Sequence, residues 1–283
     1  MSSRSATGYH LETTGQAAKT AAKHAVDKVA DPSIEFMGAC FCPFVQRAWI
    51  ALEVLNQGLP DDQSRKASKV DYAYVEIDPY KKPKELLEVS PKGLVPAARL
   101  GQGKSLHDSL ILMHYLASLP LSTGENPLLP KGPYERARVL LAGQRHAETI
   151  TPAFYRYLQA QEAEKQVEHG KEFTEALEAF EKDMNEDGPF FFGKDLGWVD
   201  ILIAPWAIRF GPVLEHYRQF SPPVISDKSR RFVKWLDAIK SHPAVAATTS
   251  TDELYTDSYH RYAKNIPNLS QVADAINSGK ALP

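Results

Sequence analysis

Apolar and polar positions follow different periods in the two halves of this chain. In the first half, short apolar or alternating runs separate stretches with helical spacing. The expected strands are residues 34–37, 72–78, 95–100 and 105–106, and the expected helices are 44–55, 83–89 and 109–116. The polar stretch 56–69, between the first helix and the second strand, is expected to be an exposed loop. The order β-α-β-α-β-β-α predicts a small mixed α/β layer.

Beyond residue 121 only helical periods remain. Residues 122–133 are rich in Gly and Pro and have the composition of a linker. Helices are expected over 134–148, over 150–169 with a break or kink near Pro152, around the stripe Phe173, Leu177, Phe180 and Met184, and over 199–210 and 232–239. Tyr255, Tyr259 and Tyr262 also fall at helical spacing. The second half is therefore predicted to be all-helical.

Length and charge narrow the class of protein. The chain has 283 residues, enough for two domains, and a formal net charge of −2 from 33 Lys and Arg against 35 Asp and Glu. We expect no nucleic-acid partner and no membrane, because there is no basic block, no bilayer-length apolar run and no signal peptide. Residues 15–30 are alanine- and lysine-rich. A mitochondrial presequence is one interpretation of them, but a surface helix or extension fits the acidic residues better.

The candidate chemistry lies at Cys42-Pro43, where a strand is expected to give way to a helix. Proline suits the first helical position, so Cys42 is the expected N-cap, where the positive end of the helix favours thiolate over thiol. The alternative is a small buried hydrophobic residue. Cys40 and Cys42 are expected on one side of a strand, in poor geometry for a disulfide. Cys40 is then either a resolving thiol or, as we favour, inert packing.

Other chemistry has less support. The two cysteines and nine scattered histidines show no pattern of metal ligands or of a catalytic triad, so we expect no metal. Two cysteines without a disulfide framework favour a reducing compartment, and we expect a cytoplasmic protein.

Four motifs together resemble one family. They are Phe41-Cys42-Pro43-Phe44 with Arg47, Gly93-Leu94-Val95-Pro96, Asp108-Ser109, and the stretch 190–206, FFFGKDLGWVDILIAPW. In this order and spacing they resemble the cytosolic glutathione transferases of the cysteine type, namely the omega class and its lambda and dehydroascorbate reductase relatives. The resemblance covers residues 34–245. It implies the glutathione transferase fold, an α/β thioredoxin-like N-terminal domain plus an all-α C-terminal helical domain.

The resemblance also implies a division of the chain and of its site. The expected parts are an N-terminal extension (1–32), a thioredoxin-like glutathione-binding domain (33–121), a linker (122–133), an all-helical domain (134–270) and a tail (271–283). Cys42 is the implied catalytic residue. The implied glutathione-binding residues are Phe44, Lys82, Val95, Pro96, Asp108 and Ser109, and the implied acceptor pocket includes Tyr155 and Trp206.

Each implied glutathione contact has a physical reason and an ordinary alternative. A cis Pro96 leaves the backbone of Val95 facing outward, where an extended peptide can pair with it as an added strand, whereas most X-Pro bonds are trans. Ser109 suits the carboxylate and Asp108 the ammonium group of a γ-glutamyl unit, whereas Asp-Ser often only caps a helix. The glutathione transferases of the omega class usually have Glu in place of Asp108. Lys82 suits the glycyl carboxylate, whereas a loop lysine is usually solvated.

The second half offers weaker candidates. Phe44 and Tyr155 are possible parts of the acceptor pocket beside Trp206, and core packing explains all three as well. Gly197 stands where the family normally caps a helix with Ser or Thr, and Asp200 follows three residues later. Because Gly is a tolerable N-cap, we expect this helix to form with Asp200 in a structural role.

The sequence therefore predicts a glutathione-dependent thiol transferase or reductase, active in deglutathionylation and dehydroascorbate reduction. The partners expected are glutathione, as a substrate, and a small electrophilic, disulfide or hydrophobic acceptor, with the family's homodimer as the assembly. Two alternatives remain. One is a glutathionyl-hydroquinone reductase, in which Trp commonly stands in place of Phe44. The other is a non-catalytic protein that binds flat hydrophobic ligands.

Overall fold

The computed structural model describes residues 8–56, 70–121, 126–221 and 230–283. The chain divides into two compact units. The first, called here the α/β unit, comprises Met1–Arg136 and His242–Leu254, and the second, the helical unit, comprises Ala137–Ser241 and Tyr255–Pro283. The segment 242–254 thus belongs with the first half of the chain, although a long helical stretch separates the two in sequence.

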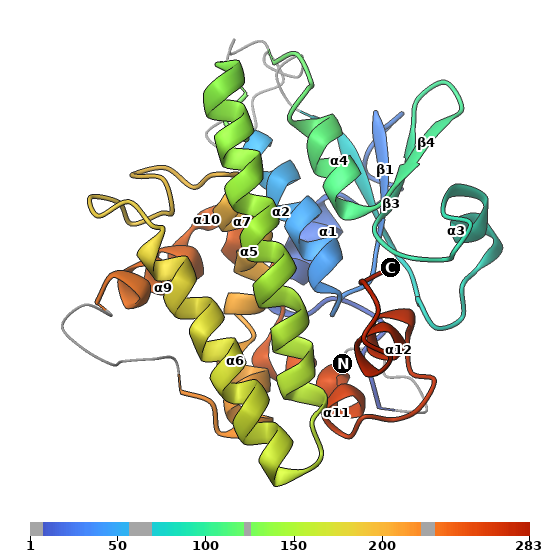
Figure 1. Ribbon diagram of the computed structural model, residues 1–283. Helices are drawn as coiled ribbons and strands as arrows, with labels where there is room; N and C mark the ends of the chain where they lie inside the picture. Colours follow the sequence, from blue (N-terminus) through green and yellow to red (C-terminus); the bar gives the residue numbers. More distant parts are fainter. Residues whose placement is uncertain (1–7, 57–69, 122–125, 222–229) are drawn as a thin grey trace. The chain divides into compact units, whose positions relative to one another are not determined.

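A sheet of four strands forms the centre of the α/β unit (Figure 1). The strands are β1 (Ile34–Gly38), β2 (Tyr72–Glu76), β3 (Ala97–Leu100) and β4 (Lys104–His107), in the spatial order β2-β1-β3-β4. β1 is parallel to β2 and antiparallel to β3, which is antiparallel to β4. Together with the helices between them, these strands confirm the order β-α-β-α-β-β-α.

Helices cover both faces of this sheet, as the alternation of side chains along β1 and β2 requires. The helices of the unit are α1 (Gly15–Lys23), α2 (Pro43–Asn56), α3 (Lys84–Val89), α4 (Ser109–Leu116) and α10 (Pro243–Ala247). On one face, Trp49 of α2 stacks on Tyr74 of β2, with ring centroids 4.3 Å apart. On the other face, Leu86 and Val89 of α3 form an apolar cluster with Met37 of β1. Burial of these side chains holds α2 and α3 on opposite faces.

The helical unit is built around two long neighbouring helices, α5 and α6 (Figure 1). Its elements are α5 (Pro133–Gln159), α6 (Ala163–Lys182), α7 (Trp198–Ala207), the π-helical turn η2 (Phe210–Glu215), α8 (His216–Arg218), α9 (Arg230–Ser241), α11 (Asp252–Ala263) and α12 (Gln271–Asn277). The first three residues of α11 count with the α/β unit. Phe154 of α5 meets Phe173 of α6 edge to face at 6.0 Å, and Phe173 also contacts Phe210 and Phe220. A cluster of buried aromatic rings thus forms the core.

Asp200 fixes the start of α7, as the sequence predicted. Its carboxylate accepts hydrogen bonds from the backbone N–H of Gly197 at 2.9 Å, from the N–H of Phe191 at 2.8 Å and from Nε1 of Trp235 at 2.7 Å. Burial raises the pKa of Asp200 to about 6, although these donors oppose the rise. Gly197 therefore serves as N-cap because the side chain three residues later supplies the capping oxygen.

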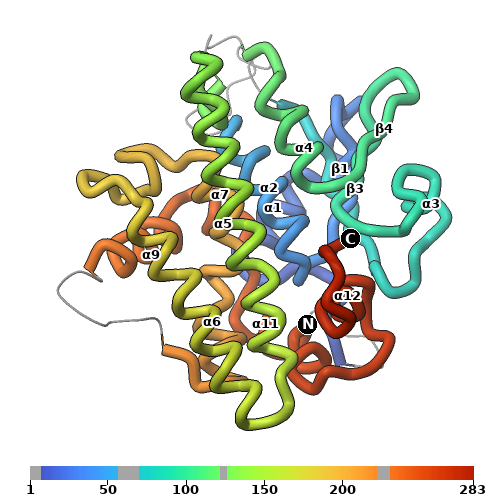
Figure 2. Tube along the Cα trace, viewed as in Figure 1, coloured from blue at the N-terminus to red at the C-terminus, as the bar shows by residue number. Residues whose placement is uncertain are grey.

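The expected break near Pro152 is wrong. α5 is continuous through Pro152, and Figure 2 follows the helix without interruption. A proline inside a helix costs about 3 kcal/mol because it removes a backbone hydrogen bond and its ring crowds the preceding turn. Ile150, Ala153 and Phe154 are almost completely buried on either side of it. Burying one large apolar side chain contributes about 2 kcal/mol to the free energy of unfolding. The burial of these neighbours therefore offsets the cost of the proline.

Two other expectations concern the N-terminal half. The stretch predicted as a surface helix or extension contains α1, which contacts the end of α10 and the segment after it. The hydroxyl of Thr20 donates to the carbonyl of Ala247 at 2.7 Å, and the N–H of Ala17 donates to the carbonyl of Thr249 at 3.1 Å. The expected loop over residues 56–69 lies, apart from its first residue, outside the described residues.

Among the helices that the structure describes, none has both the length and the apolar character needed to cross a bilayer.

Candidate active site

Cys42 lies in a tight turn between β1 and α2. Its N–H donates to the carbonyl of Ala39 at 3.0 Å, and its own carbonyl accepts the N–H of Gln46 at 3.1 Å. Because α2 begins at Pro43, Cys42 occupies the N-cap, where the helix end favours an ionised sulfur. Cys42 is half-buried and reduced. The strand prediction for the two cysteines is wrong, because β1 ends at Gly38 and the turn follows at once.

Gly38 allows α2 to start so close to the sheet. A Cβ atom at this position would lie 2.6 Å from a methyl group of Val45 and 3.0 Å from the hydroxyl of Tyr74. The first distance is shorter than real Cβ contacts, and the second is tighter than most of them. The absence of a side chain thus lets the first turn of α2, and with it Cys42, pack directly on the end of β1.

The loop before β3 lies beside the sulfur of Cys42. The Val95–Pro96 peptide bond is cis, as the family resemblance implies. Sγ of Cys42 is 3.9 Å from the carbonyl oxygen of Val95, to which the thiol donates. The loop is held by Ser90, whose hydroxyl accepts the N–H of Leu94 at 3.1 Å. The structure therefore brings together the predicted nucleophile and the predicted backbone site for glutathione.

Lys82 lies along the same loop. It has a positive φ of 44°, and its ammonium group donates to the carbonyl of Lys92 at 3.0 Å. Gly93 must be glycine here, because φ is +62° and a Cβ atom would lie 2.6 Å from Cδ of Lys82. The packing of Lys82 against Gly93 keeps its aliphatic chain next to the loop, and the ammonium group has two further hydrogens for other acceptors.

Asp108 and Ser109 begin α4, as predicted, but they differ in surroundings. Asp108 is exposed, has a φ of 78°, and its Oδ1 accepts the N–H groups of Leu110 at 2.8 Å and Ile111 at 3.1 Å. Ser109 is buried, and its hydroxyl oxygen accepts a hydrogen bond from Nε of Arg47 at 2.8 Å. Because that oxygen accepts from Arg47, its own proton is directed elsewhere and is available to a carboxylate.

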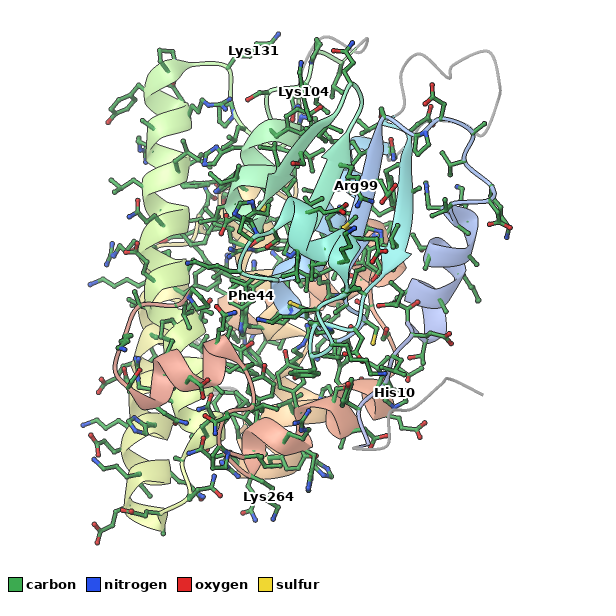
Figure 3. The ribbon with its side chains drawn as sticks, turned by 90° about the vertical axis from the view of Figure 1, so that its right-hand side faces the viewer. His10, Phe44, Arg99, Lys104, Lys131 and Lys264 are labelled. Carbon is green, nitrogen blue, oxygen red and sulfur yellow. The ribbon has the colours of Figure 1, made fainter. Side chains whose placement is uncertain are left out.

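The sequence motif contained Arg47 but assigned it no role. Its side chain is 5% exposed, and its guanidinium carbon lies 5.1 Å from the ring centroid of Phe44, three residues earlier on the same face of α2. Phe44 is labelled in Figure 3. Arg47 thus joins α2, which carries the nucleophile, to the first residue of α4. The available signal was an arginine within a largely apolar helix, five residues after Cys42, since arginine is seldom buried without specific partners.

The predicted acceptor residues belong to the helical unit. Tyr155 of α5 is 2% exposed and packs against Phe154 and Tyr262, and Trp206 of α7 is fully buried. Their role in an acceptor pocket stays a prediction.

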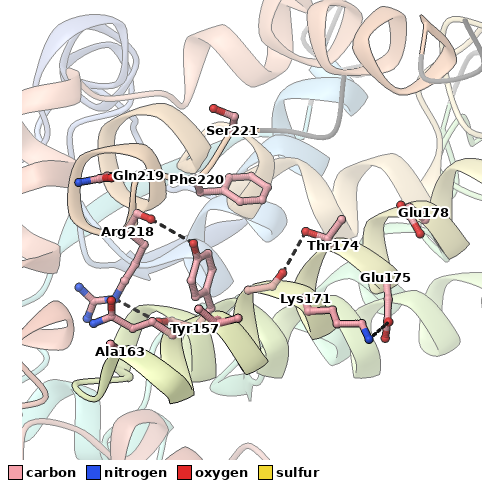
Figure 4. A pocket seen from close by; sticks show the side chains of 13 residues that line it. Tyr157, Ala163, Lys171, Thr174, Glu175, Glu178, Arg218, Gln219, Phe220 and Ser221 are labelled. Carbon is pink, nitrogen blue, oxygen red and sulfur yellow. Dashed lines mark hydrogen bonds and ion pairs between the residues drawn. The ribbon is translucent and has the colours of Figure 1, made fainter. Parts of the chain in front are cut away.

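A groove of about 650 Å³ lies along α6 in the helical unit (Figure 4). Tyr157 and Arg218 hold one end together, because the hydroxyl of Tyr157 donates to the carbonyl of Arg218 at 3.1 Å and Nε of Arg218 donates to the carbonyl of Tyr157 at 3.2 Å. An ion pair between Lys171 and Glu175, 3.7 Å long, lies further along the groove. None of the residues predicted to bind glutathione or its acceptor lines it.

The α/β unit therefore combines a reduced cysteine at a helix N-terminus, a backbone carbonyl beside its sulfur, and a serine at a second helix N-terminus. Among the residues that the structure describes, no three His, Cys, Asp or Glu side chains gather to hold a metal ion. The family model of the glutathione S-transferase N-terminal domain matches residues 36–122, and that of the C-terminal domain matches residues 147–238. The chain belongs to the glutathione S-transferase family.

Its relatives include omega-class transferases, as the motifs predicted. Probable glutathione transferase omega-2 of Caenorhabditis briggsae is 30% identical over 234 residues, which span 81% of this chain and 85% of that protein. Glutathione S-transferase DHAR2 of Arabidopsis thaliana is 30% identical over 210 residues, which span 74% of this chain and 84% of that protein. The crystal structure of glutathione transferase Omega 3C from Trametes versicolor matches with a TM-score of 0.73 and 33% identity, over 90% of this transferase and 98% of that chain. The predicted fold, a thioredoxin-like domain plus a helical domain, is confirmed.

Proposed function

We propose that this transferase is a glutathione-dependent thiol transferase and reductase in which Cys42 is the nucleophile. The observation that carries the proposal is the place of its sulfur, at the N-cap of α2 and 3.9 Å from the carbonyl of Val95. A thiolate is favoured at a helix N-terminus, and glutathione extended along the Val95 loop would bring its own sulfur beside Cys42.

The proposed glutathione site uses the backbone of Val95 before Pro96 for the cysteinyl part of the tripeptide, as in the addition of a strand. The hydroxyl and N–H of Ser109 receive the γ-glutamyl carboxylate, while Oδ2 of Asp108 receives the ammonium group, since Oδ1 already caps α4. Lys82 receives the glycyl carboxylate. The ring of Phe44 covers one side of the site.

The chemistry is thiol–disulfide exchange in two steps. The Cys42 thiolate attacks the glutathione sulfur of a glutathionylated substrate, which breaks the substrate's disulfide, forms a Cys42–glutathione disulfide and releases the substrate as a thiolate that takes up a proton. A second glutathione, as its thiolate, then attacks the glutathione sulfur bound to Cys42. The products are glutathione disulfide and the Cys42 thiolate, so the two electrons delivered to the substrate come from two molecules of glutathione.

This exchange supports deglutathionylation. For dehydroascorbate, which has no disulfide, we propose that the Cys42 thiolate adds to a carbonyl carbon. A glutathione thiolate then attacks the Cys42 sulfur, which breaks the carbon–sulfur bond, releases ascorbate and leaves the Cys42–glutathione disulfide that the second glutathione resolves as above. The similarity to an omega-class transferase and to the plant protein named DHAR2 supports both activities. We propose a small electrophilic, disulfide or hydrophobic acceptor, with Tyr155 and Trp206 in its pocket, and a homodimer as the working assembly. A reducing compartment such as the cytoplasm suits the two free cysteines.

The test compares wild type with the variants Cys42→Ser and Cys40→Ser. Turnover is measured with glutathione and the mixed disulfide of glutathione and 2-mercaptoethanol, with glutathione disulfide formation coupled to NADPH oxidation by glutathione reductase. We expect Cys42→Ser to lower kcat/KM by about 100-fold or more, because a nucleophile is lost, and Cys40→Ser to retain activity. Equal turnover in wild type and Cys42→Ser would refute the assignment. Absence of turnover in wild type, together with tight binding of flat hydrophobic dyes, would favour the binding protein instead.

A further inference from the structure

A short N-terminal segment, residues 9–14, is bound to the α/β unit and is called here the strap. Tyr9 and His10 are 5% and 3% exposed. The hydroxyl of Tyr9 donates to the carboxylate of Asp78, at 3.0 Å and 3.1 Å from its two oxygens, and the N–H of Thr13 donates to Oε2 of Glu76 at 3.1 Å. The strap is therefore held by two carboxylates at and just beyond the end of β2.

The strap covers Cys40. The thiol of Cys40 donates to the carbonyl of His10 at 3.3 Å, and its residue is 9% exposed (His10 is labelled in Figure 3). Burial, and secondarily the negative charge of Glu76, raise the pKa of the Cys40 thiol well above its usual range. Cys40 is more deeply buried than Cys42, and a buried thiol with a raised pKa is a poor nucleophile near neutral pH, because the thiolate is the reactive form.

The strap also contacts the residue between the two cysteines. The ring of Tyr9 meets Phe41 edge to face at 5.9 Å and Tyr80 at 4.8 Å, and Phe41 stacks on Tyr80 at 5.8 Å. The turn that carries Cys40 and Cys42 is thus packed against the strap through Phe41.

This arrangement matters for the reaction, because Cys40 lies two residues from the proposed nucleophile. In the Cys42–glutathione disulfide, a nearby thiolate could attack Cys42, release glutathione as a thiolate and form a Cys40–Cys42 disulfide. Alternatively, Cys40 could exchange with glutathione disulfide and carry a second glutathione. Both outcomes would withdraw the enzyme from a cycle that uses glutathione alone.

We propose that the strap excludes Cys40 from thiol–disulfide exchange and thereby restricts this transferase to a one-cysteine cycle. The inference rests on the proposed function of Cys42. Three contacts hold the strap over Cys40. The carbonyl of His10 accepts from the thiol, Tyr9 donates to Asp78, and the N–H of Thr13 donates to Glu76. None of these residues belongs to the proposed glutathione site. α1 has its own hydrogen bonds to the end of α10 and to the segment after it, so removal of the strap leaves these contacts in place.

The experiment uses wild type, a form lacking residues 2–13, and that form with Cys40→Ser. Each is incubated with glutathione disulfide and analysed by intact mass and peptide mapping under non-reducing conditions. In wild type we expect one glutathione, on Cys42, and modification of Cys40 in less than about a tenth of the molecules, because its thiol is sealed. In the strapless form we expect Cys40 to react in more than about half of the molecules, as a second adduct or as a Cys40–Cys42 disulfide. The Cys40→Ser form should return to one adduct.

Outcomes for the strap and for the function can be told apart. A strapless protein that still carries one glutathione on Cys42, with Cys40 untouched, overturns the strap proposal and leaves the proposed function intact. A wild type that takes up no glutathione on Cys42 refutes the proposed function. If the truncated chain does not fold, full-length Tyr9→Ala decides the matter: alkylation of Cys40 by iodoacetamide should be at least about 5-fold faster than in wild type, and an equal rate overturns the strap proposal.

Discussion

Glu76 offers the sharpest test of the physical reasoning, through the substitution Glu76→Gln. Its carboxyl group lies at the end of β2, accepts the N–H of Thr13 at 3.1 Å and the hydroxyl of Tyr74 at 3.3 Å, and is half-buried. Burial raises its pKa from 4.5 to about 8, and the hydrogen-bond donors offset only part of that rise. Near neutral pH the folded protein thus keeps a proton on Glu76 that the unfolded chain has already released.

The direction in which pH changes the free energy of unfolding follows from the number of protons that each state binds. Below pH 4.5 the carboxyl group is protonated in both states, so its full contribution to stability is present. Between pH 4.5 and about 8 the folded state binds more protons than the unfolded state, and the free energy of unfolding falls as pH rises. Each pH unit in this window costs about 1.4 kcal/mol, so at pH 7 the loss is about 3 kcal/mol.

Glutamine removes the ionisation and keeps the contacts. Its amide oxygen can accept the N–H of Thr13, and its NH₂ group can donate to the hydroxyl oxygen of Tyr74. We therefore expect Glu76→Gln to be more stable than wild type at pH 7, by an amount that grows with pH from 5 to 8. The assay is urea unfolding of the reduced proteins across this range. Glu85→Gln, an exposed carboxylate on α3, is the matched control. A stability difference that stays constant with pH, or that shrinks as pH rises, refutes the reasoning.

Three further substitutions test other features. Asp200→Asn should lower the free energy of unfolding by about 2 kcal/mol, because the amide NH₂ faces one of three N–H donors; equal urea midpoints would contradict this capping role. Arg47→Lys should raise KM for glutathione about 5-fold with a smaller change in kcat, because the lysine lacks the Nε–H group that positions Ser109; a steady-state KM equal to wild type would contradict it. Pro152→Ala should stabilise α5 by about 1–2 kcal/mol in thermal unfolding, and a lower Tm would show that packing of the ring matters more than the lost hydrogen bond.

Local signals predicted most of the secondary structure. The apolar run before Cys42 predicted β1, and Pro43 after it predicted the start of α2. Proline fits the first position of a helix, where its missing N–H would have no helical partner, but it does not fit the helix interior. Asp108-Ser109 marked the start of α4 for a similar reason, the need for a capping oxygen. The continuity of α5 through Pro152 was missed, because it depends on the burial of neighbouring side chains rather than on the local chain.

The candidate site shows the same contrast between local signals, which the sequence contains, and long-range contacts, which only the folded chain makes. The N-cap position of Cys42 could be predicted because its signal, Pro43 at the start of the helix, is the next residue. The hydrogen bond from Arg47 to Ser109 and the cap of His10 on Cys40 join residues 62 and 30 positions apart. No periodicity encodes such contacts, because they arise when the sheet brings α2, α4 and the N-terminal segment together.

The contact between Arg47 and Ser109 adds positive charge to the proposed glutathione site. Cys42 and Ser109 stand at the N-termini of two helices, each of which presents backbone N–H groups and a partial positive charge. Arg47 adds a buried positive charge and fixes the serine hydroxyl as an acceptor toward itself, so that the hydroxyl proton is left for another acceptor. Glutathione supplies two matching anions, a thiolate and a γ-glutamyl carboxylate, and exchange at Cys42 also begins from a thiolate. In the proposed function, the helix end that favours the Cys42 thiolate would therefore lie in the same site as the groups that receive the glutathione carboxylate, and a substitution at Arg47 should act on the second of these, through Ser109.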